Sequence, residues 1–223
     1  MAEQRVVVTR GKNFMFWSDG TITIENVRLS HPHIFVAVEG KDNNKRPNGK
    51  FDYSCVGLAP KDTHKEFLQF IKKHMQEILN DKKPKNWPAS KDYVIPADKK
   101  FVRNGDDTPK LENHGSWIIS AREKKRPAVR DINGAPLSHE SQEDQDSVYG
   151  GVWGSLLVRP WYQNNDNGER INANLIAVRL TRTPAGRSGD ALGAGRLAQD
   201  EIDKSFGDDS YDTEQEVPID DDL

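Results

Sequence analysis

The segment between residues 153 and 161 places residue types that bind nucleic acid at alternate positions. Successive side chains of an extended strand point to opposite faces, so Trp153, Arg159 and Trp161 share one face. The other face carries small and aliphatic residues that suit a core: Val152, Gly154, Leu156 and Val158. Indole rings stack on bases of any sequence, and a guanidinium pairs with phosphate. The pattern therefore predicts a surface that binds single-stranded nucleic acid. Ordinary packing of both tryptophans is the alternative.

A cluster of basic residues begins at the end of the strand predicted at residues 117–122. It comprises Arg122, Lys124, Lys125 and Arg126, interrupted by Glu123. Four positive charges at the end of a strand suit phosphate contacts, whereas a solvated loop without a partner is the alternative. Three further residues are candidates for the nucleic-acid surface: Trp117 in this same segment, and Arg28 and Arg179 in other β segments.

The sequence lacks the motifs of phosphate-binding loops, serine hydrolases and zinc peptidases. Cys55 lies in an apolar segment, which favours a core position over a nucleophile. Asp106 and Asp107 could join a two-metal nuclease site, but their Asn, Gly, Thr and Pro neighbours favour a turn. His64 and His74 are ten residues apart, too far along a helix to share an ion, so we expect them on the helix surface. We therefore expect a protein without catalytic activity, cofactor or metal.

The charge of the chain is unevenly distributed. Residues 200–223 contain eleven acidic residues and one lysine, a net charge of −10, although the whole chain of 223 residues carries −3. Residues 1–199 therefore carry +7. A basic body with an acidic tail favours binding of a polyanion by the body and an interaction role for the tail. A tail that only aids solubility is the alternative.

The remaining composition limits the location of the protein. The single cysteine excludes an intramolecular disulfide, and a reducing compartment fits this. No apolar run is long enough to span a bilayer, and the first residues lack the apolar core of a signal peptide. We therefore expect a cytoplasmic protein with no membrane partner.

Turn residues separate several segments with the composition of strands. These segments are residues 21–29, 50–58, 117–122, 148–162 and 171–182. Residues 82–96 and 133–146 are polar and suit loops. Short strands spaced by turns predict a small barrel or sandwich.

One amphipathic helix is predicted between the second and third of these segments. Thr63 and Glu66 form a capping box at its start, and Pro84 stops the pattern. Its apolar residues recur at helical spacing and predict that the helix plugs or flanks the barrel: Phe67, Phe70, Ile71, Met75 and Ile78. We expect one barrel domain over residues 1–185, a Gly-rich hinge over 186–199 and a disordered acidic tail over 200–223.

Residues 147–154, S-V-Y-G-G-V-W-G, resemble an element of a family of phage single-stranded DNA-binding proteins that was long filed as a domain of unknown function. Further segments in the family's order are residues 27–35, 50–61, 104–106 and 126–129. The resemblance covers nearly all of residues 20–206. It implies an OB-type β-barrel that coats single-stranded DNA during phage replication or recombination, in the host cytoplasm.

The resemblance also implies a tail that recruits phage or host replication proteins. Two features depart from the family. Leu157 stands where the family often has a polar residue, and the tail ends in Asp220, Asp221, Asp222 and Leu223 rather than in an aromatic residue. These four residues are the expected partner-binding end. The alternatives are a recombination mediator or strand-annealing protein, a metal-dependent nuclease and a structural protein of the virion.

Overall fold

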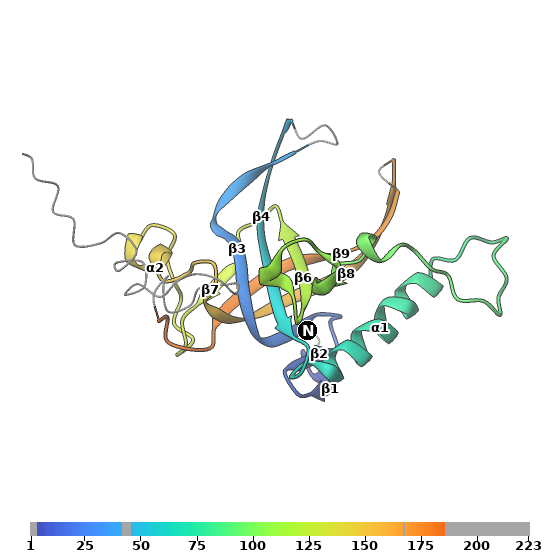
Figure 1. Cartoon of the computed structure of the whole chain (residues 1–223), viewed down its shortest axis with the longest axis horizontal. Helices are drawn as coiled ribbons and strands as arrows, with labels where there is room; N and C mark the ends of the chain where they lie inside the picture. Colours follow the sequence, from blue (N-terminus) through green and yellow to red (C-terminus); the bar gives the residue numbers. More distant parts are fainter. Residues whose placement is uncertain (1–3, 42–45, 167, 186–223) are drawn as a thin grey trace, which may run out of the picture.

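The structure, a computed structural model, describes residues 4–41, 46–166 and 168–185 (Figure 1). Within these ranges the strands are β1 (Val7–Gly11), β2 (Phe14–Trp17), β3 (Ile22–Lys41), β4 (Pro47–Pro60), β5 (Val102–Asn104), β6 (Ser116–Glu123), β7 (Ala128–Arg130), β8 (Trp153–Asn165) and β9 (Gly168–Leu180). The α-helices are α1 (Lys65–Asn80) and α2 (Gln142–Asp146). The predicted hinge over residues 186–199 and acidic tail over 200–223 lie outside the described residues.

Strands β3, β4, β6, β9 and β8 close into a barrel. β3 pairs with β4 and β8, β4 pairs with β6, and β8 pairs with β9, all antiparallel. The ring closes where β6 runs parallel to β9, at Arg122 and Asn174. This closed ring confirms the predicted mainly β, OB-type barrel.

All five predicted strand segments fall in barrel strands, but some boundaries differ. β8 begins at Trp153 rather than at residue 148, and β3 continues beyond residue 29 to Lys41. β3 and β4 extend past the barrel as a two-stranded ribbon (Figure 1). Part of the predicted loop over residues 133–146 forms the short helix α2. The strands β1, β2, β5 and β7 are additions to the sequence-based expectation.

A bulge in β3 keeps its apolar residues inside the barrel. Ile22 and Ile24 are buried two residues apart, but the next buried aliphatic residue, Val27, comes three residues later. The register with β8 shifts between Ile24 and Val27, and Asn26 between them has a φ of 53°. Asn tolerates this left-handed region better than most residues, and Asn26 Nδ2 donates to Asn13 Oδ1 at 2.9 Å. The change in spacing is therefore absorbed by one residue.

α1 buries one stripe against the barrel core, as predicted. The buried residues are Phe67, Ile71, Met75 and Leu79, and Ile78 is half-buried. Phe70 lies beside the stripe and stacks on Phe14 of β2, with ring centroids 4.9 Å apart. The helix thus covers the barrel together with the β1–β2 hairpin.

The start of α1 differs from the predicted capping box. The N-cap is His64, and no side chain caps the helix. The Glu66 carboxylate instead accepts a hydrogen bond from the backbone N–H of Lys12 at 2.8 Å. Thr63 Oγ1 lies 3.3 Å from the Pro60 carbonyl, to which it donates. The prediction of a capping box was wrong because the Glu66 carboxylate, which the box requires, accepts its hydrogen bond from the β1–β2 turn.

The two histidines of the helix region are less exposed than expected. His64 is fully buried, and its Nε2 lies 2.8 Å from the Glu25 carbonyl oxygen. A surface position was therefore the wrong prediction for His64, because this ring satisfies a strand carbonyl in the core. His74 is half-buried against Phe16, with ring centroids 4.9 Å apart, and burial lowers its pKa.

Cys55 lies in the barrel interior, as predicted. It is 1% exposed, and burial raises the pKa of its thiol to about 12. A thiol in this state is a packing group rather than a nucleophile. Over the described part of the chain, no helix combines the length and apolar character needed to span a membrane.

Candidate nucleic-acid interface

The outer face of the barrel between β6 and β9 holds a pocket rich in cations. It encloses about 120 Å³, and its charged lining residues are Lys99, Lys100, Arg103, Arg122, Arg170 and Asp98. We call it the arginine pocket. β5 carries Arg103, whose guanidinium donates to Ser120 Oγ at 3.0 Å. Lys99 lies 3.4 Å from Asp98, so the three arginines supply an excess of positive charge.

The β8–β9 hairpin continues the arginine pocket. Gln163 lies opposite Arg170, and Trp161 lies opposite Asn172. Opposed residues of antiparallel strands share a face, and Asn172 Nδ2 donates to Gln163 Oε1 at 2.8 Å. We call these four residues the hairpin front. Trp161 is 40% exposed, so part of its flat ring is open to a ligand.

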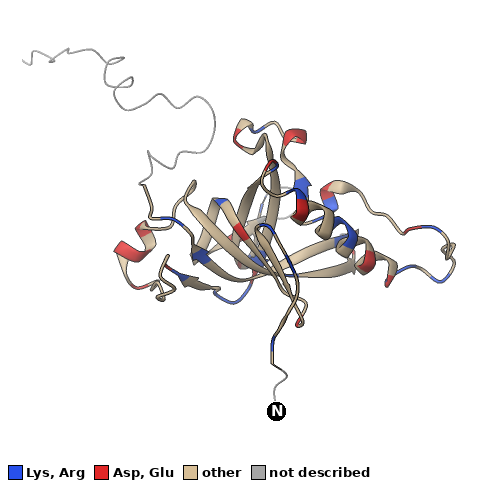
Figure 2. Cartoon of the chain, turned by 90° about the horizontal axis from the view of Figure 1, so that it is seen from below, with Lys and Arg blue, Asp and Glu red and all other residues tan. Residues whose placement is uncertain are grey.

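Three strands bring distant candidates to one level of the barrel. Asn174 pairs with Arg159 on β8 and with Arg122 on β6. Neighbouring strands lie about 4.8 Å apart, which puts the Cα atoms of the two arginines about 10 Å apart. The structure therefore places Arg122, Arg159 and Trp161 on one outer surface. Lys and Arg residues recur along the barrel strands and their loops (Figure 2).

A second hollow extends this surface over β4. It encloses about 290 Å³, with Val56 and Ile118 in its lining and Pro109 and Lys110 beside them. Arg103 lines both this hollow and the arginine pocket. One surface therefore runs from β4 across β6 to the hairpin front.

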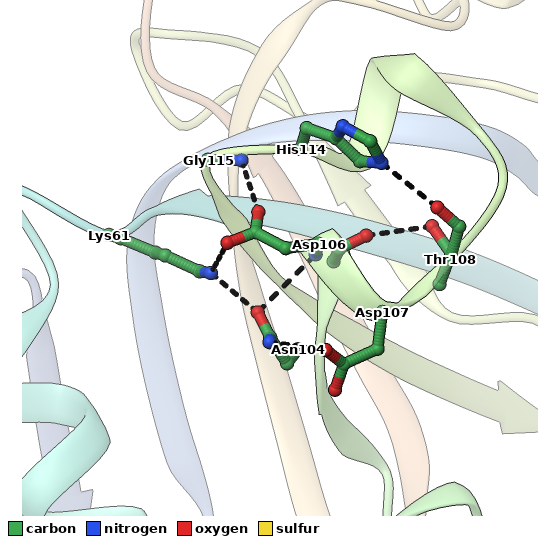
Figure 3. Close-up of polar contacts among 8 residues, drawn as sticks. Lys61, Asn104, Asp106, Asp107, Thr108, His114 and Gly115 are labelled. Atoms are coloured by element: carbon green, nitrogen blue, oxygen red, sulfur yellow. Dashed lines mark hydrogen bonds and ion pairs between the residues drawn. The ribbon is translucent and has the colours of Figure 1, made fainter.

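Polar contacts fix the loop beside the second hollow (Figure 3). The Asp106 carboxylate accepts hydrogen bonds from Lys61 Nζ and from the backbone N–H of Gly115. The bond from Lys61 and that from Gly115 lower the pKa of Asp106. Asp107 accepts from Asn104 Nδ2 at 2.8 Å. Both carboxylates therefore serve the turn, which was the favoured interpretation over a nuclease site.

Metal-binding groups do not gather elsewhere in the described ranges. No cluster of three or more His, Cys, Asp or Glu side chains there could hold an ion.

The basic loop between β6 and β7 lies at the foot of the β3–β4 ribbon. Lys124, Lys125 and Arg126 are exposed. The Arg126 guanidinium lies 5.7 Å from the ring centre of Tyr53 on β4. Phe51, two residues before Tyr53, is 58% exposed. Cations and aromatic rings thus meet at this edge of the barrel.

Trp153 lies at the far end of β8 from Trp161, and Arg28 of β3 lies opposite it. The guanidinium carbons of Arg28 and Arg182 lie 5.0 Å and 4.0 Å from the Trp153 ring centre. Arg179 lies opposite Ser155 on the same outer face. These candidates form a second group, separate from the arginine pocket.

Trp117 lies at the end of β6 remote from Arg122. Lys61 and Lys72 approach its half-buried ring, at 4.9 Å and 5.6 Å from the centroid. Its ring therefore packs beside α1, and a role for it in nucleic-acid binding stays a prediction.

Two arginines of the pocket, Arg103 and Arg170, are missing from the sequence candidates. Arg170 alternates with buried Ile171 in β9, so its outward position could have been found from the period of two. Arg103 lies in a strand of three residues, which is too short to show a period.

The back of the β8–β9 hairpin is fastened to α1. Glu169 accepts hydrogen bonds from the Tyr162 hydroxyl, at 2.7 Å, and from the Tyr93 hydroxyl. The backbone N–H of Tyr93 donates in turn to Asn80 Oδ1 at 3.1 Å. Burial and the bond to Glu169 raise the pKa of Tyr162. The hairpin front is therefore held from behind by an uninterrupted chain of contacts.

Known proteins resemble this chain over most of its length. The family described as Enterobacter phage Enc34, ssDNA-binding protein, matches residues 20–217. The solved structure of the single-stranded DNA-binding protein from bacteriophage Enc34 in complex with ssDNA is 35% identical, with a TM-score of 0.69; the match covers 83% of this chain and 100% of that chain. Protein p50 of Acyrthosiphon pisum secondary endosymbiont phage 1 is 27% identical over 199 residues, 88% of this chain and 97% of that protein.

A more distantly related protein shares the fold alone with this chain. The structure of gp2.5, a single-stranded DNA-binding protein encoded by bacteriophage T7, is 14% identical with a TM-score of 0.50, and the match covers 78% of this chain and 98% of that chain.

Proposed function

This chain belongs to the family of the Enterobacter phage Enc34 ssDNA-binding protein, and we propose that it binds single-stranded DNA without catalysing a reaction on it. The observation that carries the proposal is the arginine pocket beside the hairpin front. OB-type barrels bind oligonucleotides on their second and third strands and on the loops at either side. In this barrel those strands are β4 and β6, and the flanking elements are the β3–β4 ribbon and the β8–β9 hairpin.

Phosphates and bases have separate partners on this surface. Arg103, Arg122 and Arg170 present guanidinium groups to the phosphates of the strand. Trp161 offers its exposed ring to a base, and stacking is tolerant of sequence because every base has a π-face. The binding is therefore general rather than sequence-specific.

The outer cations extend the phosphate contacts. Arg159 lies beside Trp161 on the same strand face, and Lys124, Lys125 and Arg126 line the edge toward the β3–β4 ribbon. Their exposed positions suit a mobile polyanion, since a surface cation exchanges one partner for another at little cost.

The biological role follows as a further part of the proposal. The protein coats strands exposed during phage DNA replication or recombination, in the host cytoplasm. Its acidic tail competes with DNA for the basic surface and recruits phage or host replication proteins when DNA displaces it. The charge of −10 on residues 200–223 supports this role.

Binding of labelled single-stranded DNA, duplex DNA and RNA of equal length, at two salt concentrations, tests the proposal. We expect the single strand of DNA to bind more tightly than the duplex, with affinity falling as salt rises. The strand should stay intact when Mg²⁺ is added. Equal affinity for the duplex, or metal-dependent cleavage of the strand, would contradict the proposal.

A further inference from the structure

A groove lies on the outer face of β8, below the hairpin front. It encloses about 420 Å³, and we call it the β8 groove. Met15 and Thr23 line one side, Ile132 lines the other, and Leu157 lies in the outer face between them. Leu157, Arg159 and Trp161 occupy alternate positions of β8 and so share its outer face. The groove at Leu157 therefore begins where the hairpin front at Trp161 ends.

The β8 groove carries positive charge that its own contacts do not cancel. Arg179 donates to the Ile132 carbonyl at 2.8 Å, and Arg130 donates to the Gly134 carbonyl at 3.4 Å. Carbonyl acceptors are neutral, so these hydrogen bonds do not offset the positive charge of either guanidinium group. Among the described residues that line the groove, Glu25 contributes a carboxylate. The groove therefore favours a polyanion.

Beyond the residues that line the β8 groove, at the start of β8, further cations lie around an aromatic ring. Arg182 and Arg28 lie over Trp153, which begins β8. From Trp161 to Trp153 is eight residues, or about 26 Å at the usual rise of a strand. Cations thus occur at intervals along the whole outer face of this strand.

Arg159 connects the two surfaces. Its guanidinium lies 3.7 Å from Asp19 and is half-exposed. Asp19 has a second cation partner, because Arg5 approaches it at 3.2 Å. An exposed pair of this kind adds little stability, so Arg159 can turn to a phosphate while Arg5 still compensates Asp19.

We infer that the β8 groove is a second segment of the strand-binding path, in which a single strand leaves the arginine pocket, passes Trp161 and Arg159, and follows β8 to Trp153. The inference rests on the proposed function. The apolar lining of the groove, with Met15, Leu157 and Ile132, suits the sugar and base, while Arg130 and Arg179 suit the phosphates. A short oligonucleotide occupies only the arginine pocket, and only a longer oligonucleotide reaches the β8 groove.

Oligonucleotides of increasing length test this path. The full-length protein and its R130Q/R179Q variant are titrated with labelled oligo-dT from about 6 to about 24 nucleotides, a range that brackets the usual site of one OB barrel. We expect equal Kd values for the two proteins on the shortest strands. On the longest strands the variant should bind more weakly, and its log Kd against log salt should be flatter by up to about 1.4 for two lost phosphate contacts.

Two matched variants separate the path from general effects. R122Q, in the arginine pocket, should weaken binding at every length, and R182Q should act only on strands long enough to reach Trp153. Equal loss at all lengths in R130Q/R179Q, or no loss at any length, would overturn the inference. If the wild-type protein fails to bind even the longest oligonucleotide, the proposed function itself is refuted. That result differs from a loss of affinity in R130Q/R179Q that is equal at all lengths, which refutes only the inference about the β8 groove.

Discussion

Removal of the positive charge from the arginine pocket is the most direct perturbation of the proposed surface. The variant is R103Q/R122Q/R170Q. All three side chains line the same pocket of about 120 Å³, and glutamine keeps a hydrogen-bond donor for Ser120 in place of Arg103. The change therefore removes three charges from one place and leaves the buried side of the barrel intact.

The expected magnitude follows from counterion release. Each phosphate contact contributes about 0.7 to the slope of log affinity against log salt for a single strand, so three contacts contribute about 2.1. Between about 50 mM and about 200 mM salt, a slope of 2.1 corresponds to about an 18-fold loss of affinity. The wild-type protein should therefore lose about 18-fold more affinity than the variant over this interval.

Fluorescence anisotropy of labelled oligo-dT across a salt series measures this difference. The matched control is K82Q/K85Q/K91Q, which removes the same charge from exposed positions of the loop after α1. Thermal melting confirms that both variants remain folded. A variant slope equal to that of the wild type, or an equal decrease in the control, would refute the assignment of the pocket to phosphates.

The other expected outcomes concern one residue or segment each. Trp161→Ala should weaken single-strand binding by roughly 1–3 kcal/mol if its ring stacks on a base, and wild-type affinity in a folded variant would remove it from the site. Tyr93→Phe removes the hydroxyl that donates to Glu169, so the backbone amides of the hairpin tip should exchange hydrogen faster; unchanged exchange would show that the contact is dispensable. Burial lowers the pKa of His74 from 6.5, so the folded state favours the neutral ring. The free energy of unfolding should then fall as pH decreases below about 6.5, where the unfolded chain takes up the proton first, and denaturant titrations of the wild type and His74→Gln should diverge below this pH. Removal of residues 200–223 should tighten DNA binding most at low salt, and weaker or unchanged Kd values there would contradict competition by the tail.

Turn residues and strand composition predicted the barrel strands, and the period of two predicted the outer face of β8. Gly154, Leu156 and Val158 are buried, whereas Arg159 and Trp161 are exposed. The same reasoning fails at the bulge of β3, where Asn26 changes the period between Ile24 and Val27. A bulge depends on the register with a neighbouring strand, and that register is a tertiary property.

The arrangement of the site was harder to predict than its residue types. Arg122 and Arg159 reach the same level of the barrel only because β9 lies between β6 and β8 and pairs with both. Local patterns report the face of a residue within its own strand, but they do not report which strands are neighbours. The pocket therefore includes Arg103, which comes from a strand of three residues and has no pattern of its own.

The β8–β9 hairpin explains why the back of this surface matters as much as its front. A two-stranded hairpin is marginally stable alone, and flexible side chains lose entropy when they order around a ligand. Alternation along β9 puts Arg170 on the front and Glu169 on the back, where Tyr162 and Tyr93 donate to it. The contact through Tyr93 continues to Asn80 near the end of α1. The helix thus holds the hairpin in place before DNA binds. Ordering of Trp161 and Arg170 therefore reduces the binding free energy by less.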